Sequence, residues 1–353
     1  MSEKAYIEES SALLKQGEFE RYIQHSQDHL KSIRKDQQYP HDQKSIDHNS
    51  PYCLIPENFD HQRAILMIHG FIASPYAMRA VSDHYLKKGY MVLAIVLPGH
   101  GSTPKQLLEC DNKDWLKVCK SALEGLKKHA EKIAIGGYSL GGALAFLTAH
   151  KQSIDHLFLM VPCLALAPAH SVAQVFGHIV PKWPLKRICL QPPPQMEHHP
   201  VQYEQFPMAA VVSVLNAVSA FKKLPTSSWE NTCIKMIATH EDITVLADKS
   251  LEFFKKNQHP KSYLRFYSAK PLHFDDTRIA VIDSRKLGNN IQSMSHIAVP
   301  FTTQDPIYGS SSFHAGYGET NWQLGEFLPD EKKQRARLTY NPDFKAMMEA
   351  CLS

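Results

Sequence analysis

The sequence lacks any apolar run long enough to cross a membrane. A spanning helix needs a stretch of about 18 or more apolar residues, and none occurs in the 353-residue chain. The first ten residues, MSEKAYIEES, carry acidic residues where a secretory signal would have a basic start followed by an apolar run. We therefore expect no transmembrane segment and a cytoplasmic location.

The sequence also lacks an excess of charge of one sign. It has 39 basic and 35 acidic residues, for a net charge of +4. Proteins that bind nucleic acid carry a clustered basic surplus, so this balance argues against a nucleic-acid partner. Hydrophobic residues make up 43% of the chain, which is enough for the large core of a globular protein.

Cysteine pairs and metal-ligand spacings are missing as well. The seven cysteines include no CxxC pair, so we expect reduced and mostly buried thiols. His198 and His199 stand next to each other in a proline-rich stretch, without partners at ligand spacing. The sequence therefore predicts no metal site.

Short apolar runs alternate with amphipathic segments over most of the chain. This alternation is typical of βαβ units, which build a parallel sheet that is buried on both faces. The predicted strands are Ala64–Ile68, Tyr90–Leu97, Lys132–Gly136, His156–Val161, Cys233–Ala238, Tyr263–Tyr267 and Ile279–Ile282. The predicted helices are Tyr76–Lys88, Asp114–His129, Gly141–His150, Pro207–Lys223 and Leu246–Asn257, the fourth with Val211, Leu215 and Val218 facing inward. The sequence therefore predicts the α/β class.

The alternation is interrupted once and flanked by polar extensions. Seven prolines lie between Pro168 and Phe206, so we assign residues 168–206 to a cap inserted over the C-terminal edge of the sheet. Residues 56–167 form the first part of the core, and residues 207–353 form the second part with a C-terminal extension. Residues 1–55 are a polar N-terminal extension that we expect to pack on the core.

One pentapeptide carries the chemistry. Gly137-Tyr138-Ser139-Leu140-Gly141 matches G-x-S-x-G between a predicted strand and a predicted helix. The pattern also occurs in ordinary glycine-rich turns, and the flanking strand and helix favour the functional interpretation. A serine on such a strained turn needs tiny residues two positions before and after it. The sequence therefore predicts Ser139 as the nucleophile of a serine hydrolase.

A serine nucleophile also needs donors for the oxyanion that forms when it attacks a carbonyl group. The residue after the nucleophile, Leu140, supplies one backbone N–H, and the loop after the first predicted strand, His69-Gly70-Phe71, supplies another. We assign the second donor to the N–H of Phe71. The imidazole of His69 is interpreted as structural.

These motifs resemble those of bacterial carboxylesterases and monoacylglycerol-lipase-like α/β hydrolases. The resemblance covers about residues 60 to 250 and implies the α/β-hydrolase fold, a cap, an acyl-enzyme mechanism and no cofactor. The residues that carry it are His69-Gly70-Phe71, Ser74-Pro75, Leu97-Pro98-Gly99-His100-Gly101, Asp114-Trp115 and the pentapeptide around Ser139.

The remaining triad members follow Ser139 in the chain order serine, acid, histidine. Asp242 comes shortly after a predicted strand, as in the family's acid loop, and Glu241 is its neighbouring rival. Two histidines compete for the third place. His273 lies just past a predicted strand, but two aspartates follow it, which suits a solvated turn. The segment around His296 resembles the histidine loop of a subgroup of the family. We favour His296.

The sequence thus predicts a hydrolase of carboxylic esters that acts through an acyl-enzyme. The expected partner is a small-molecule acyl ester, either an acyl glycerol or a small ester. Lysophospholipase or thioesterase activity is the alternative within this enzyme class. A non-catalytic binding protein of the same fold is the alternative outside it, as is an interaction surface formed by the two terminal extensions.

Overall fold

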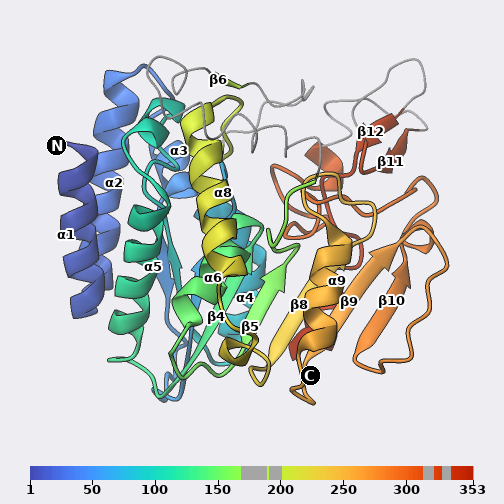
Figure 1. Cartoon of the computed structure of the whole chain (residues 1–353). Coiled ribbons are helices and arrows are strands. Elements are labelled where there is room, and N and C mark those ends of the chain that lie inside the picture. Colours follow the sequence, from blue (N-terminus) through green and yellow to red (C-terminus); the bar gives the residue numbers. More distant parts are fainter. Residues whose placement is uncertain (168–188, 191–200, 313–321, 328–334, 353) are drawn as a thin grey trace.

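An eight-stranded sheet organises the part of the chain that the structure describes, residues 1–167, 189–190, 201–312, 322–327 and 335–352 (Figure 1). This computed structural model orders the strands β1-β3-β2-β4-β5-β8-β9-β10. Every neighbouring pair is parallel except β1 against β3. The strands are β1 (Tyr52–Leu54), β2 (Arg63–Ile68), β3 (Met91–Ile95), β4 (Lys132–Tyr138), β5 (Leu157–Met160), β8 (Ile234–Thr239), β9 (Tyr263–Ser268) and β10 (Ile279–Asp283). The mostly parallel sheet with flanking helices confirms the predicted fold class.

Each face of the sheet has its own hydrophobic core. Alternate residues of β2 enter different cores: Ala64, Leu66 and Ile68 pack on one face, and Ile65 and Met67 on the other. The first core includes residues of α5 (Asn112–Leu126), α6 (Leu140–Ala149), α8 (Met208–Lys222) and α9 (Ala247–Lys256). The second includes residues of α4 (Arg79–Lys87), α11 (Phe344–Leu352) and the segments around residues 291–308 and 322–338.

Short elements connect these layers. The 3₁₀ helices are η1 (Pro75–Met78), η2 (Pro104–Leu108), η4 (Thr226–Ser228) and η5 (Ser284–Lys286). Two small sheets complete the described elements: β6 (Cys189–Leu190) pairs with β7 (Phe206–Pro207), and β11 (Gln323–Gly325) pairs with β12 (Arg335–Arg337). Within the described residues, no helix combines the length and the apolar character that crossing a membrane would require.

The N-terminal residues fold as helices α1 (Glu3–Gln16), α2 (Phe19–Asp36) and α3 (Gln43–Asn49), of which α1 packs along α5. The contact is so close that a Cβ on Gly125 would lie 1.9 Å from the carbonyl oxygen of Leu14. The buried Glu3 carboxylate accepts a hydrogen bond from the Gly99 N–H at 3.0 Å. Arg34 Nε donates to the Gly101 carbonyl, also at 3.0 Å. These helices therefore support the loop after β3.

The predicted strands and helices of the core match the observed elements within a few residues, with one error of orientation. Val218 of α8 is buried as expected, but Val211 and Leu215 are only half-buried, and Val214 and Ala217 are buried instead. Residues 52–54, which the prediction left in the N-terminal extension, form edge strand β1. Most of the predicted cap at 168–206 lies outside the described residues.

Candidate active site

Ser139 lies in a sharp turn between β4 and α6. Its backbone has φ 53° and ψ −116°, a conformation that costs energy for any residue with a side chain. The turn closes so tightly that a Cβ on Gly137 would lie 2.4 Å from the Gly141 carbonyl oxygen. A Cβ on Gly141 would lie 2.1 Å from the Ile68 carbonyl oxygen. The two glycines of the motif are therefore steric requirements of the turn.

The structure brings Ser139, His296 and Asp242 together in one hydrogen-bonded chain. His296 Nε2 lies 3.0 Å from Ser139 Oγ, and His296 Nδ1 lies 2.6 Å from Asp242 Oδ2. The other oxygen of Asp242 accepts hydrogen bonds from the N–H groups of Thr244 and Val245, at 2.7 and 2.9 Å. These two bonds fix the carboxylate, so Nδ1–H donates to Asp242 and Nε2 is left to accept the serine proton.

The rival residues lie elsewhere. The His273 side chain is 91% exposed, and its ionic neighbour is Asp275 at 3.8 Å. Glu241 Oε1 accepts a hydrogen bond from the Ala269 N–H at 3.0 Å and lies 3.1 Å from His240 Nδ1. Neither rival contacts Ser139, so the arrangement favours Asp242 and His296 for the triad.

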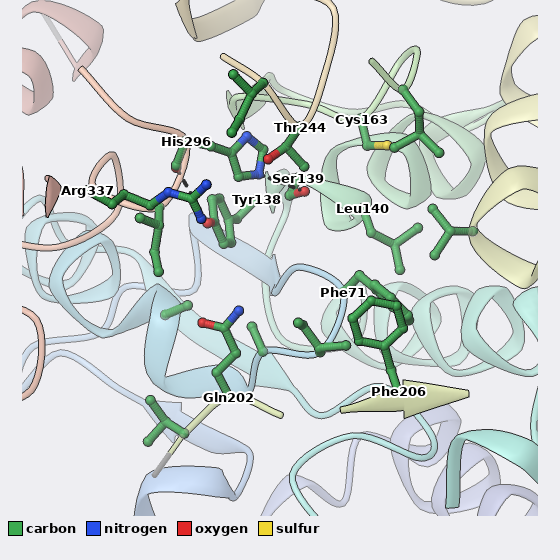
Figure 2. A pocket seen from close by; sticks show the side chains of 18 of the residues that line it. Phe71, Tyr138, Ser139, Leu140, Cys163, Gln202, Phe206, Thr244, His296 and Arg337 are labelled. Carbon is green, nitrogen blue, oxygen red and sulfur yellow. Dashed lines mark hydrogen bonds between the residues drawn. The ribbon is translucent and has the colours of Figure 1, made fainter. Parts of the chain in front are cut away.

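The two predicted oxyanion donors flank the serine. Leu140 is the first residue of α6, where backbone N–H groups have no partner within the helix. Gly70 comes so close that a Cβ on it would lie 3.2 Å from Ser139 Cβ, which brings the following residue, Phe71, beside the nucleophile (Figure 2). Among the residues that the structure describes, neither N–H has a hydrogen-bond acceptor. Both are therefore available to a ligand oxygen.

His69 holds the loop that carries Phe71. Its Nδ1 lies 2.8 Å from the Gly70 carbonyl, and its Nε2 accepts a hydrogen bond from the Leu97 N–H at 3.0 Å. Burial keeps the pKa of His69 well below the usual range, and the nearby His100 lowers it further. A neutral, fully buried imidazole with both nitrogens engaged agrees with the structural role predicted for it.

A cavity of about 350 Å³ opens beside Ser139. Its lining is mostly apolar, with Phe71 and Phe206 packed together on one side, at 5.3 Å between ring centroids, and His296 and Arg337 on the other (Figure 2). The lining residues are Phe71, Ile72, Ala73, Ala77, Tyr138, Ser139, Leu140, Cys163, Leu166, Val201, Gln202, Phe206, Val211, Val214, Ile243, Thr244, His296, Ile297, Phe301, Tyr308 and Arg337. Such a cavity suits an apolar group attached to a polar reacting centre.

Side chains from distant segments hold the loop that carries His296. Thr239 Oγ1 donates to the Met294 carbonyl at 2.7 Å, and Ser295 Oγ donates to the Leu338 carbonyl. Glu326 accepts a hydrogen bond from the backbone N–H of His296. Sequence reasoning missed Glu326, because it lies 30 residues from His296 and belongs to no motif.

Glu326 is a buried carboxylate, and within the described residues its cationic neighbour is Arg337. Its side chain has no exposed surface, and Arg337 Nε lies 3.1 Å from its Oε1. The pKa of Glu326 is raised to about 7. Burial is the main cause and the negative charge of Asp242 adds to it, while Arg337 and the His296 N–H act in the opposite direction. The described residues contain no cluster of His, Cys, Asp or Glu able to hold a metal ion, and His198 and His199 lie outside them.

Comparisons with known proteins give the same fold. The alpha/beta hydrolase fold family matches residues 63–187. A thermostable monoacylglycerol lipase of Bacillus sp. (strain H-257) is 32% identical over 91 residues, which are 26% of this chain and 36% of that protein. A carboxylesterase of Bacillus subtilis (strain 168) is 25% identical over 158 residues, 44% of this chain and 63% of that one. The matches thus span less than two thirds of these curated relatives.

Two solved structures share the fold at low sequence identity. One comes from work on the metagenome-derived lipolytic enzymes LipS and LipT; it is 19% identical, covers 61% of this chain and 86% of that one, and has a TM-score of 0.52. The other, a soluble variant of monoglyceride lipase from Saccharomyces cerevisiae, is 14% identical, with coverage of 62% and 81% and a TM-score of 0.52. The chain is an α/β-hydrolase-fold protein that resembles carboxylesterases and monoacylglycerol lipases.

Proposed function

We propose that the protein hydrolyses carboxylic esters through a covalent acyl-serine intermediate. One observation carries the proposal: the hydrogen-bonded chain from Asp242 through His296 to Ser139 ends at a largely apolar cavity. In this proposal Ser139 is the nucleophile, His296 is the general base and acid, and Asp242 orients the imidazole.

The first half of the proposed reaction transfers the acyl group to the enzyme. Ser139 Oγ attacks the carbonyl carbon while its proton moves to His296 Nε2. The carbonyl oxygen becomes an oxyanion, which accepts hydrogen bonds from the N–H groups of Phe71 and Leu140. Collapse of this intermediate expels the alcohol, which takes the proton from His296. Each donor of this kind contributes on the order of 100- to 1000-fold in rate.

The second half regenerates the enzyme. A water molecule gives one proton to His296 Nε2 as its oxygen attacks the acyl carbon. The new oxyanion uses the same two donors, and His296 returns the proton to Ser139 Oγ as the carboxylic acid leaves. Asp242 stabilises the imidazolium in both halves because its carboxylate lies 2.6 Å from Nδ1.

The cavity supports an apolar acyl or alkyl group on the substrate. Leu140, Val211 and Val214 line it together with the two packed rings of Phe71 and Phe206. Burying such a group against them gains about 25 cal/mol per Å² of apolar surface. An acyl glycerol or a small acyl ester is therefore the proposed substrate, as the names of the relatives also suggest.

A chain-length series tests this proposal. The purified protein is assayed with p-nitrophenyl esters of increasing acyl length, then with a monoacylglycerol, a lysophospholipid and an acyl thioester of the best length. We expect saturable hydrolysis of the p-nitrophenyl esters that Ser139→Ala abolishes, and preference for the acyl glycerol over the other two. Absence of turnover at every chain length, or turnover that survives Ser139→Ala, would refute the proposal.

A further inference from the structure

We propose that Glu326 is a positioning residue for His296, holding the backbone of the histidine loop and adding a second negative charge behind the imidazole. The proposal rests on the function proposed above, because it concerns the same triad. It assigns a part in the reaction to a residue outside the serine, histidine and aspartate.

The contacts of Glu326 join three segments: its own, the loop around His296, and β12 through Arg337. Its Oε2 accepts a hydrogen bond from the His296 N–H, and its own N–H donates to Ser293 Oγ at 2.9 Å. Glu326 thus holds the histidine loop both at the catalytic residue and three residues before it. The side chain of Glu326 has no exposed surface, so water does not compete for these contacts. A misplacement of the base by about 1 Å can cost on the order of 100-fold in rate, which makes such anchoring relevant to catalysis.

A neutral side chain could also satisfy one backbone N–H. Burying a carboxylate costs several kcal/mol. A single ion pair, here with Arg337, rarely gives a net gain in stability once that cost is included. Stability alone therefore gives little reason for a charge at this position. The charge has a use if it acts on His296, which becomes an imidazolium in both halves of the reaction.

The charged and titratable groups around Glu326 determine the sign of the effect. Arg337 faces it from β12, Asp242 from the loop after β8, and the Tyr138 hydroxyl from the end of β4. In addition to these three groups, Glu326 lies near His296, and the His296 imidazole is the group that gains a proton during the reaction. A negative Glu326 stabilises the protonated imidazole, and Arg337 offsets this only in part because it also borders the solvent-accessible cavity.

Two substitutions at Glu326 separate geometry from charge. Glu326→Gln keeps an acceptor for the His296 N–H and removes the charge, whereas Glu326→Asp keeps the charge and shortens the reach. The matched control is Asp343→Asn, because Asp343 is a partly buried carboxylate that is likewise paired with an arginine, Arg265, at 2.5 Å, and it has no contact with Ser139. The readout is kcat and KM for a p-nitrophenyl ester from pH 5 to pH 9, with the melting temperature of each variant.

For Glu326→Gln we expect kcat at pH 8 to fall on the order of 10-fold or more with KM little changed. Because the raised pKa of Glu326 leaves its carboxylate ionised mainly above pH 7, the loss relative to wild type should be larger at pH 8 than at pH 5, which changes the acid limb of kcat/KM. Glu326→Asp should leave the acid limb near its wild-type position while kcat falls several-fold. Asp343→Asn should lower the melting temperature and leave kcat and the acid limb unchanged.

Three results would overturn the proposal. The first is a Glu326→Gln variant with wild-type kcat and an unmoved acid limb, and the second is a control that shifts equally. The third applies if the glutamine variant does not fold: a Glu326→Asp variant with wild-type kcat would then refute the anchoring role. Wild-type protein without esterase activity would instead refute the proposed function, so the two failures are distinguishable.

Discussion

The two sides of the candidate site are built in different ways. The serine side consists of consecutive residues, from β4 through the turn at Ser139 into α6, and backbone contacts at Gly137 and Gly141 fix its shape. The histidine side is a loop around His296, outside the strands and helices. The side chains of Thr239 in β8 and of Glu326 hold that loop through hydrogen bonds.

This difference predicts how each side fails when it is changed. Close-packed backbone has no room for an added atom, so the serine side should respond to small increases in volume. A loop held by buried polar contacts should respond to the loss of single donors, acceptors or charges. The predictions that follow test this contrast, beginning with the largest expected effect.

The largest effect is expected for Asp242→Asn, a change of one atom on the histidine side. The asparagine can keep the contacts to the Thr244 and Val245 N–H groups, but it no longer stabilises the imidazolium or selects its tautomer. We expect kcat for ester hydrolysis to fall on the order of 10⁴-fold, as such a change does in a serine triad. The neighbouring Glu241→Gln is the control and should stay within about twofold of wild type, because glutamine keeps an acceptor for the Ala269 N–H and the residue makes no contact with Ser139. Equal losses in both variants would contradict the assignment of the acid.

The next effect is expected for Gly141→Ala on the serine side. The new Cβ would lie 2.1 Å from the Ile68 carbonyl oxygen, so β2 and α6 would have to separate. We expect the free energy of unfolding to fall by about 3 kcal/mol or more, measured by urea denaturation. Gly288→Ala is the matched control, because its Cβ would meet only the Ile291 side chain, at 3.1 Å. If Gly141→Ala leaves the free energy of unfolding unchanged, the predicted difference between the two sides of the site is wrong.

The same contrast explains what the sequence could predict. Ser139, its two glycines and the donor Leu140 all lie within five consecutive positions, so their pattern is readable without knowledge of the fold. The sheet could also be predicted, because each strand and helix shows its own local periodicity in the sequence. The site residues that follow in the chain, Asp242 and His296, had to be chosen among rivals.

Long-range contacts explain what the sequence could not predict. His296 and His273 differ by packing, since one is held behind Ser139 and the other is exposed on a turn. Glu326 meets the histidine loop and Arg337 pairs with Glu326, each from a separate segment, and no spacing rule connects them. The orientation of α8 differed for a related reason: the apolar Val211 and Val214 both line the cavity, so apolar periodicity alone did not identify which of them also packs in the core.

A smaller effect is expected for Ser295→Ala in the histidine loop. The Ser295 hydroxyl donates to the Leu338 carbonyl and accepts from the Ala298 N–H at 3.1 Å, so its loss leaves two buried groups unpaired. We expect the free energy of unfolding to fall by about 1–2 kcal/mol and kcat to decrease with it. Ser284→Ala is the control, since that buried hydroxyl has no hydrogen-bond partner in the described part of the chain. If both variants lose the same stability, the hydroxyl contacts do not hold the loop.

The smallest effect concerns the pH dependence of stability. Burial raises the pKa of Glu326 to about 7 in the folded protein, above its unfolded value. Stability from this group is therefore fully present below about pH 4, the usual range for glutamate, and is lost as the pH rises through 7. We expect Glu326→Gln, which cannot ionise, to gain stability relative to wild type between pH 5 and pH 8. A stability difference that is constant over this range would contradict the raised pKa.

The central claim is that Ser139 is a nucleophile activated by His296, and covalent labelling tests it most directly. The protein is incubated with a fluorophosphonate probe, and the adduct is located and its rate measured by mass spectrometry in wild type, Ser139→Ala, His296→Ala and His273→Ala. We predict one adduct on Ser139, none in Ser139→Ala, labelling slowed on the order of 100-fold or more in His296→Ala, and an unchanged rate in His273→Ala. Labelling that persists in His296→Ala and disappears in His273→Ala, or an unlabelled wild type, would contradict it.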